Sequence, residues 1–446
     1  MKSVERIEPK SLIQIISEKE FLLLVQEICL NFFKTHNAFC KQLRKTADIN
    51  RKFYSCMIQE AEFLESFLDE HGARENKTWY FFAEYIASIR NLAIVAFLIK
   101  HLLDRYPYYN LHEDESFDKV FHAESQKTLD FLNQSILNLF EEACKAGLAN
   151  QMVIPSDSVD PEGFGDIETN QRLPRNIEED HIKEEVEQII DLCHKIHNVT
   201  KLMGDIDLGL VHDEEKLRKV IPIKIDEKKA RLLKNMIHSV QSDYDTYIKN
   251  TRMEQLYPVL KVSRGYISLP LHLLEAVLWL SHFYERHEDE IRSGECKTKI
   301  TALVDKAKLL DRIVNYAFYY AMYFLEKGDK LSEDLLKRLS KKVTYELPVP
   351  KPLGFHARPS TYISLIVRKY EGEAYLLIDG ERYNAKSVMS LLQAGGAIAD
   401  KGYETVIFEG DKQILDDIKI LAKYNYCEDQ KIPRELDYLR VLRNTA

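Results

Sequence analysis

The chain changes its hydrophobic period once, at Lys341. Before that residue, apolar side chains recur every three or four positions, and glycine and proline are almost absent up to Gly147. This spacing predicts long helices joined by short connections. After it, Val343, Tyr345 and Leu347 alternate with polar residues, as in a strand. The sequence therefore predicts a multidomain protein, all-α in its N-terminal region and α+β at its C-terminus.

The helical region is predicted to contain two lobes, residues 1–147 and 178–340. Residues 148–177 lie between them and combine proline and glycine with many carboxylates. This acidic segment is either a long loop or a linker, and the two lobes either stand apart or form one bundle.

Two stretches of the second lobe carry specific expectations. Ser268-Leu269-Pro270 is expected to open an apolar helix, because proline is tolerated in a first helical turn. An aromatic stripe near the end of the lobe is either core or a partner or dimer face, since aromatic residues are enriched at interfaces. The stripe consists of Tyr316, Tyr319, Tyr320, Tyr323 and Phe324.

The charge balance argues against two classes of partner. The net charge is −9, and residues 341–446 are nearly neutral, so the negative charge belongs to the helical region. An acidic surface does not favour nucleic acid or an anionic membrane. Glu84, Arg90 and Lys100 interrupt the apolar stretch 79–103, which we expect to be a buried core helix rather than a membrane span.

The cysteines and the N-terminus indicate a cytoplasmic protein. The seven cysteines are scattered and form no Cys-x-x-Cys pair, as expected for free thiols in a reducing compartment. The first six residues lack the apolar run of a signal peptide.

The chemistry is predicted to lie in the stretch from Gly354 to Ser360. His356 stands one residue before a predicted helix start, and Arg358 falls in the first turn. Helix N-termini offer unpaired N–H groups and the positive end of the helix dipole, so they hold phosphate well. Gly354 and Ala357 supply backbone to this loop, and a guanidinium pairs with phosphate oxygens. The stretch therefore predicts a phosphoryl group carried on His356.

Residues 341–424 resemble HPr, the histidine-containing phosphocarrier of the bacterial phosphoenolpyruvate-dependent phosphotransferase system. Gly354-Phe355-His356-Ala357-Arg358-Pro359 matches the active-site signature of that family, and Asn384-Ala385-Lys386-Ser387-Val388-Met389 matches its second signature. The two motifs stand at the interval that the family uses. The resemblance implies an open-faced β-α-β-β-α-β-α sandwich, with residues 425–446 as a C-terminal extension.

The resemblance also implies partners and roles. Phosphorylated Enzyme I would transfer its phosphoryl group to Nδ1 of His356, and Arg358 would stabilise the transferred charge. The group would then pass to a downstream acceptor or regulatory target, and no cofactor is expected beyond this group derived from phosphoenolpyruvate. An apolar docking patch is implied, with ordinary core as the alternative for its members Phe355, Val388, Met389 and Leu392.

Ser387 has two readings. Its hydroxyl is expected to cap the following helix, and the resemblance makes it a regulatory phosphorylation site for an HPr kinase. Two departures from the family stand nearby. Leu353 replaces a residue that is small and polar in many relatives, and the segment 393–401 looks about three residues longer.

No metal site is predicted. Glu178 with His181, His194 with His197, and His282 with His287 are the nearest approaches to ligand spacing, and none supplies the full set that a di-iron bundle needs. The helical region is expected to be a partner or homo-oligomer module. The competing hypotheses are a regulatory scaffold that senses phosphorylation of the HPr-like domain, and an enzyme of unrecognised type in the helical region.

Overall fold

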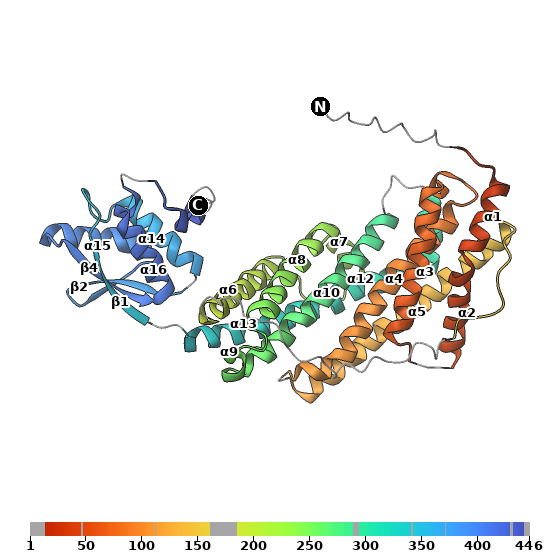
Figure 1. Cartoon of the computed structure of the whole chain (residues 1–446), viewed down its shortest axis with the longest axis horizontal. Coiled ribbons are helices and arrows are strands. Elements are labelled where there is room, and N and C mark those ends of the chain that lie inside the picture. The colour runs from red at the N-terminus through yellow and green to blue at the C-terminus, as the bar shows by residue number, and fades with distance from the viewer. Residues whose placement is uncertain are drawn as a thin grey trace, which may run out of the picture. The chain divides into compact units, whose positions relative to one another are not determined.

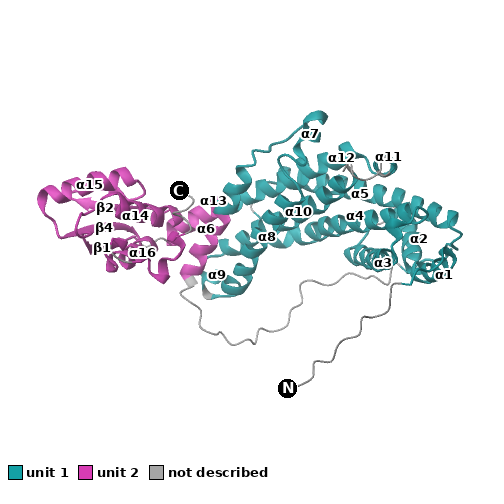
Figure 2. Ribbon diagram, turned by 90° about the horizontal axis from the view of Figure 1, so that it is seen from above, with its two compact units in different colours: residues 1–185, 198–329 teal, residues 186–197, 330–446 magenta. Residues whose placement is uncertain are grey.

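The computed structural model describes residues 14–45, 48–111, 113–160, 185–288, 294–339, 342–370, 372–428 and 431–440 (Figure 1). The chain divides into two compact units, drawn in different colours in Figure 2. The first, here the helical unit, contains residues 1–185 and 198–329, and the second, the C-terminal unit, contains residues 186–197 and 330–446.

Five helices make up the first part of the helical unit. Three of them begin at a polar residue whose side chain accepts a backbone N–H, namely Ser17, Asn50 and Asp114. The five are α1 (Glu18–Ile28), α2 (Leu30–Arg44), α3 (Arg51–Glu70), α4 (Tyr80–Arg105) and α5 (Glu115–Ala149).

The second helical stretch includes two π-helical segments, η4 (Tyr244–Ile248) and η5 (Arg312–Phe318). Its helices α6 (Glu185–Gly204) and α13 (Tyr319–Leu339) run through the division between the units. The others are α7 (Glu214–Val220), α8 (Glu227–Asp243), α9 (Arg252–Leu256), α10 (Val259–Glu288), α11 (Gly294–Leu303) and α12 (Lys306–Asp311).

Helix α4 is the centre of the helical unit and packs against α3, α5 and α10. By length and composition it could cross a membrane, contrary to the sequence expectation, but 67% of its most apolar window is buried inside the protein. Core helices commonly pass such a test, because a helix surrounded by others is apolar all round. The packing of α4 against three other helices confirms that it is a core helix of the helical unit.

Two expectations for the second stretch have different outcomes. The expected start near Pro270 is wrong, because α10 begins at Val259 and contains this proline in its interior. Burial of Leu260, Ile267 and Leu269 on the preceding turns outweighs the hydrogen bond that proline removes. Three of the five residues of the aromatic stripe form core: Tyr316, Tyr320 and Phe324 are buried and contact the ring of Phe121. Tyr319 and Tyr323 are half-buried.

The described part of the acidic segment lies along α2. Asn37 donates hydrogen bonds to the carbonyls of Pro155 and Asp157, and Lys34 forms an ion pair with Asp157 at 2.9 Å. The described residues after α5 are therefore held against α2 at Pro155 and Asp157, and the segment 161–177 lies outside the described residues.

The C-terminal unit contains a small antiparallel sheet with helices. The strands are β1 (Lys342–Pro348), β2 (Ala374–Ile378), β3 (Glu381–Asn384) and β4 (Thr405–Asp411), arranged β1-β4-β2-β3. The helices are α14 (Ala357–Tyr370), α15 (Val388–Lys401) and α16 (Lys412–Lys423). This confirms the coarse fold class, a helical N-terminal region and an α+β C-terminal region, and is consistent with an HPr-like domain.

Alternation along the strands places one face of this sheet against the helices. Leu376 and Phe408 are fully buried, whereas Ile407 on the other face is 42% exposed. Asp379 and Gly380 both have positive φ and join β2 to β3 by the tight turn expected from the Asp-Gly pair. The same core includes Leu436 and Leu439, so the C-terminal extension packs onto the unit.

Candidate functional site

His356 caps the start of α14. Its carbonyl accepts the N–H of Ser360 at 3.2 Å, and its own N–H donates to the carbonyl of Gly354 at 2.9 Å. Gly354 has a φ of +66°, a conformation that favours glycine, and its N–H donates to Pro350. The tight turn therefore brings the imidazole to the N-terminus of α14, beside first-turn amides that have no intrahelical acceptor.

One side chain from a distant part of the sequence meets this ring, and Arg358 holds the backbone of the same residue. Nε2 of His356 lies 2.9 Å from Oε1 of Glu428, a residue that the sequence analysis did not select. Arg358 donates from Nη1 to the backbone carbonyl of Glu428 at 2.9 Å. The His356 side chain is 32% exposed and that of Glu428 is 8% exposed. A half-open imidazole thus stands between solvent and a buried carboxylate.

The loop before α14 is held from two sides. Phe355 is buried, and its ring packs edge-on against Phe408 of β4 and Tyr426 of the C-terminal extension. On α15, a Cβ added at Gly395 would lie 2.5 Å from the carbonyl oxygen of Phe355. The absence of a side chain at Gly395 therefore permits α15 to approach the loop closely, a role that no local sequence signal revealed.

The residues expected to form a docking patch differ in exposure. Met389 is 67% exposed, Val388 and Leu392 are half-buried, and Phe355 belongs to the core, the alternative considered for it. Leu353 is 72% exposed on the loop before His356. The segment 393–401, which was expected to be longer than in the family, is continuous helix within α15.

Ser387 is the N-cap of α15. Its hydroxyl accepts the N–H of Ser390 at 3.3 Å, which confirms the capping expectation. The side chain is half-buried. Its regulatory phosphorylation stays a prediction.

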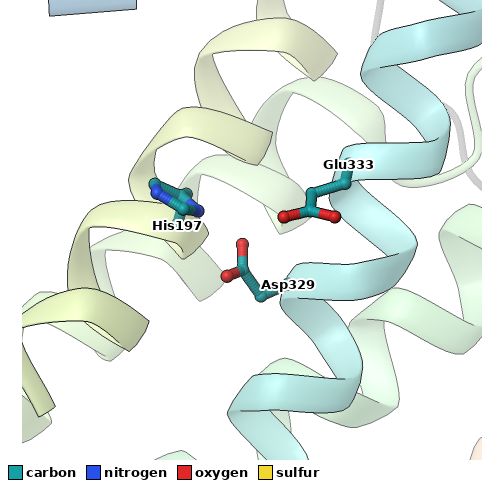
Figure 3. Close-up of side chains that lie close together, drawn as sticks. All are labelled: His197, Asp329 and Glu333. Carbon is teal, nitrogen blue, oxygen red and sulfur yellow. The ribbon is translucent and has the colours of Figure 1, made fainter. Parts of the chain in front are cut away.

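The histidines considered as metal ligands lie in different surroundings. Glu178 and His181 are outside the described residues. His282 lies 2.7 Å from Glu227, and Nδ1 of His287 lies 2.7 Å from the carbonyl of Phe283. Figure 3 shows a group not anticipated from sequence, His197 of α6 with Asp329 and Glu333 of α13, whose ligand atoms lie within 4.8 Å of one another.

No metal is assigned to this group. Asp329 belongs to the helical unit, whereas His197 and Glu333 belong to the C-terminal unit. Glu333 is also exposed, and exposed carboxylates beside a histidine are common without an ion.

Comparisons with known proteins bear on the C-terminal unit. Its arrangement places a histidine at a helix N-terminus, two residues before an arginine, in a small α+β domain. Residues 343–421 match the PTS-HPr family model, described as the PTS HPr component phosphorylation site. The region preceding this match has no family-model match. No curated protein and no solved structure matches the chain.

The match confirms the resemblance seen in the two sequence motifs. A domain of this family indicates a phosphocarrier role in the phosphotransferase system and interaction with components of that system.

Proposed function

We propose that the protein carries a phosphoryl group on Nδ1 of His356, received from phosphorylated Enzyme I and passed to a downstream acceptor or regulatory target. The observation that carries this proposal is the position of His356 at the N-terminus of α14 with Arg358 one residue inside the helix. Helix amides and a guanidinium stabilise the charge of a transferring phosphoryl group, which is the main requirement of this chemistry.

The proposed transfer exchanges one nitrogen–phosphorus bond for another. The lone pair of Nδ1 attacks phosphorus in line, and the bond to the histidine of Enzyme I breaks, returning its electron pair to that ring. Arg358 is exposed, and one of its guanidinium nitrogens donates to the backbone carbonyl of Glu428. Its remaining donors are available for the phosphoryl oxygens. No cofactor is needed beyond the phosphoryl group itself.

The proposal extends to partners and location. Enzyme I would dock on the apolar side chains beside the loop, with Met389 the most exposed of the expected patch, and an HPr kinase would act on Ser387. The relay places the protein in the cytoplasm of a bacterial cell. The six cysteines that the structure describes are free thiols, which suits that compartment.

The test is phosphorylation of the full chain by cognate Enzyme I, magnesium and labelled phosphoenolpyruvate. We expect one acid-labile, base-stable phosphate per chain, absent from His356→Ala. His356 is the last histidine in the sequence, after His287. Label retained by His356→Ala would place the acceptor elsewhere and contradict the proposal.

A regulatory role is the second candidate, and it uses the same phosphohistidine. The helical unit forms most of the chain and has no family-model match, so it offers a surface on which phosphorylation of His356 could be read out. A labelled protein that returns its phosphoryl group to Enzyme I but gives it to no permease component would favour this role over relay.

A further inference from the structure

We propose that Glu428 is a positioning residue for His356, delivered by residues 425–428 and 431–440, here the C-terminal clasp. This inference rests on the proposed phosphocarrier function. Oε1 of Glu428 and Nε2 of His356 lie 2.9 Å apart, and neither has another hydrogen-bond partner among the described residues. Their alignment falls short of a regular hydrogen bond, as is common in a resting active site, where such bonds tighten when the substrate binds.

The clasp is tied to the active loop on both sides of Glu428. The side chain of Asn425 accepts the N–H of Lys351 and donates to its carbonyl, at 2.9 and 2.6 Å. The hydroxyl of Tyr426 donates to the carbonyl of Pro348 at 2.9 Å. Arg358 then holds the backbone carbonyl of Glu428 itself. These contacts hold the backbone that carries Glu428 beside the active loop.

The backbone that delivers Glu428 is strained. Asn425, Tyr426 and Cys427 have φ values of 48°, 53° and 61°, three consecutive non-glycine residues in the left-handed region. Such residues are uncommon and persist where the surrounding packing over-determines them. Tyr426 and Cys427 are buried, and burial raises the pKa of both side chains, so neither serves as a charged group. The strain serves to aim the next residue, Glu428, at the ring.

The rest of the clasp anchors this turn to the core. Leu436 and Leu439 are fully buried. The hydroxyl of Tyr438 donates to Asp417 of α16 at 2.6 Å, and the ammonium of Lys369 lies 3.6 Å from the centroid of the same ring. The clasp lies beyond residue 421, where the family match ends.

The contact selects the reacting nitrogen. A carboxylate accepts a hydrogen bond, so Glu428 favours the neutral tautomer with its proton on Nε2 and leaves the lone pair on Nδ1. When Nδ1 forms its bond to phosphorus, the bond to the donor nitrogen breaks and Nε2 keeps its proton. The ring then bears positive charge, which the carboxylate of Glu428 stabilises.

The experiment compares Glu428→Gln and Glu428→Asp with Glu435→Gln, a matched control in an exposed part of the clasp. In the full chain, nitrogen-15 shifts of the His356 ring are measured where the ring is neutral, and the rate of phosphorylation by Enzyme I is measured in parallel. We expect Glu428→Gln to move the ring away from the Nε2–H tautomer and to slow phosphorylation about 10-fold or more. Glu428→Asp should restore part of both, and Glu435→Gln should change neither.

The two readouts separate this inference from the proposed function. An unchanged tautomer in Glu428→Gln overturns the positioning role, even if phosphorylation slows, because slowing alone would make Glu428 a docking residue. Failure of the unaltered protein to accept phosphate would overturn the proposed function, while the nitrogen-15 shifts would still decide whether Glu428 sets the tautomer.

Discussion

A histidine–glutamate pair in the helical unit and another in the C-terminal unit place the same two residue types in opposite surroundings. In the helical unit, Nε2 of His287 lies 3.6 Å from Oε2 of Glu84, and both residues are almost fully buried. In the C-terminal unit, the corresponding atoms of His356 and Glu428 are 2.9 Å apart, with the ring half-open to solvent.

The surrounding groups explain the contrast. Arg74 forms an ion pair with Glu84, Arg286 lies 3.5 Å away, and Nδ1 of His287 is engaged by a backbone carbonyl. Glu84 is thus neutralised by cations, and the ring of His287 beside it is buried away from solvent. At the other pair, Arg358 donates to the backbone carbonyl of Glu428 and forms no ion pair with a carboxylate of the described residues, so its charge remains for a ligand. A histidine and a glutamate form a structural network when they are buried beside arginines, and a candidate reaction centre when the histidine is half exposed to solvent.

The largest expected effect is a loss of stability when the Glu84–His287 pair, but not the His356–Glu428 pair, is altered. Glu84→Gln should lower the free energy of unfolding of the helical unit by about 3 kcal/mol, because it removes the buried anion that Arg74 and Arg286 share, although Arg74 keeps its ion pairs with Glu65 and Asp69. Both tryptophans, Trp79 and Trp279, lie in this unit, so urea unfolding followed by tryptophan fluorescence reports on it selectively.

The matched variants for this measurement are Glu62→Gln, at an exposed position of α3, and Glu428→Gln. The first should change the helical unit by less than about 0.5 kcal/mol. Glu428→Gln should leave the tryptophan transition unchanged. Equal losses from Glu84→Gln and Glu62→Gln would mean that the buried network contributes no more than a surface charge.

Acid should weaken the helical unit through the same carboxylate. Burial raises the pKa of Glu84, but His287, Arg74 and Arg286 outweigh it and lower the pKa to about 2, from an ordinary value of 4.5. A carboxyl with a lowered folded pKa stabilises the protein above its unfolded pKa and loses that contribution as pH falls through the folded value. Between pH 6 and pH 2 the loss should be about 3 kcal/mol.

Urea unfolding across this pH range tests the assignment. The slope of stability against pH between 4.5 and 2 should be shallower in Glu84→Gln than in the unaltered protein. Identical slopes would show that other carboxylates govern the acid transition.

Arg358→Ala tests the exposed guanidinium beside the His356–Glu428 pair. It should slow phosphorylation of His356 about 10- to 100-fold, a loss of about 1.4–2.7 kcal/mol of transition-state stabilisation. Arg358→Lys retains the charge but not the paired donors, and should recover part of the rate. A wild-type rate in Arg358→Ala would assign the charge stabilisation to the helix amides alone.

The smallest expected effect concerns Ser387. Ser387→Asp keeps an N-cap acceptor but adds charge beside Val388 and Met389, where docking of Enzyme I would desolvate it. Phosphorylation of His356 should slow several-fold, which corresponds to a rise of less than about 1 kcal/mol in the activation free energy. Ser387→Asn is the neutral capping control, and an equal slowing in both variants would point to the cap rather than to charge.

Local sequence determined most of the helices and strands and the motif around His356. The change of period at Lys341, the Asp379-Gly380 turn, the cap at Ser387 and the helix start after His356 all depend on residues within a few positions of one another. Each of these features is set by backbone preference and short-range hydrogen bonding, which a linear pattern records directly.

Tertiary structure alone decided which residues meet these motifs. Glu428 lies 72 positions after His356, and its contact depends on a strained turn and on Leu436 and Leu439 entering the core. Pro270 stands inside a helix because packing on the preceding turns outweighs its local preference to begin one. Glu84 lies in an apolar stretch that gave no sign of the arginines from other helices that neutralise it. Burial and long-range charge pairing depend on the whole fold, so no window of sequence contains them.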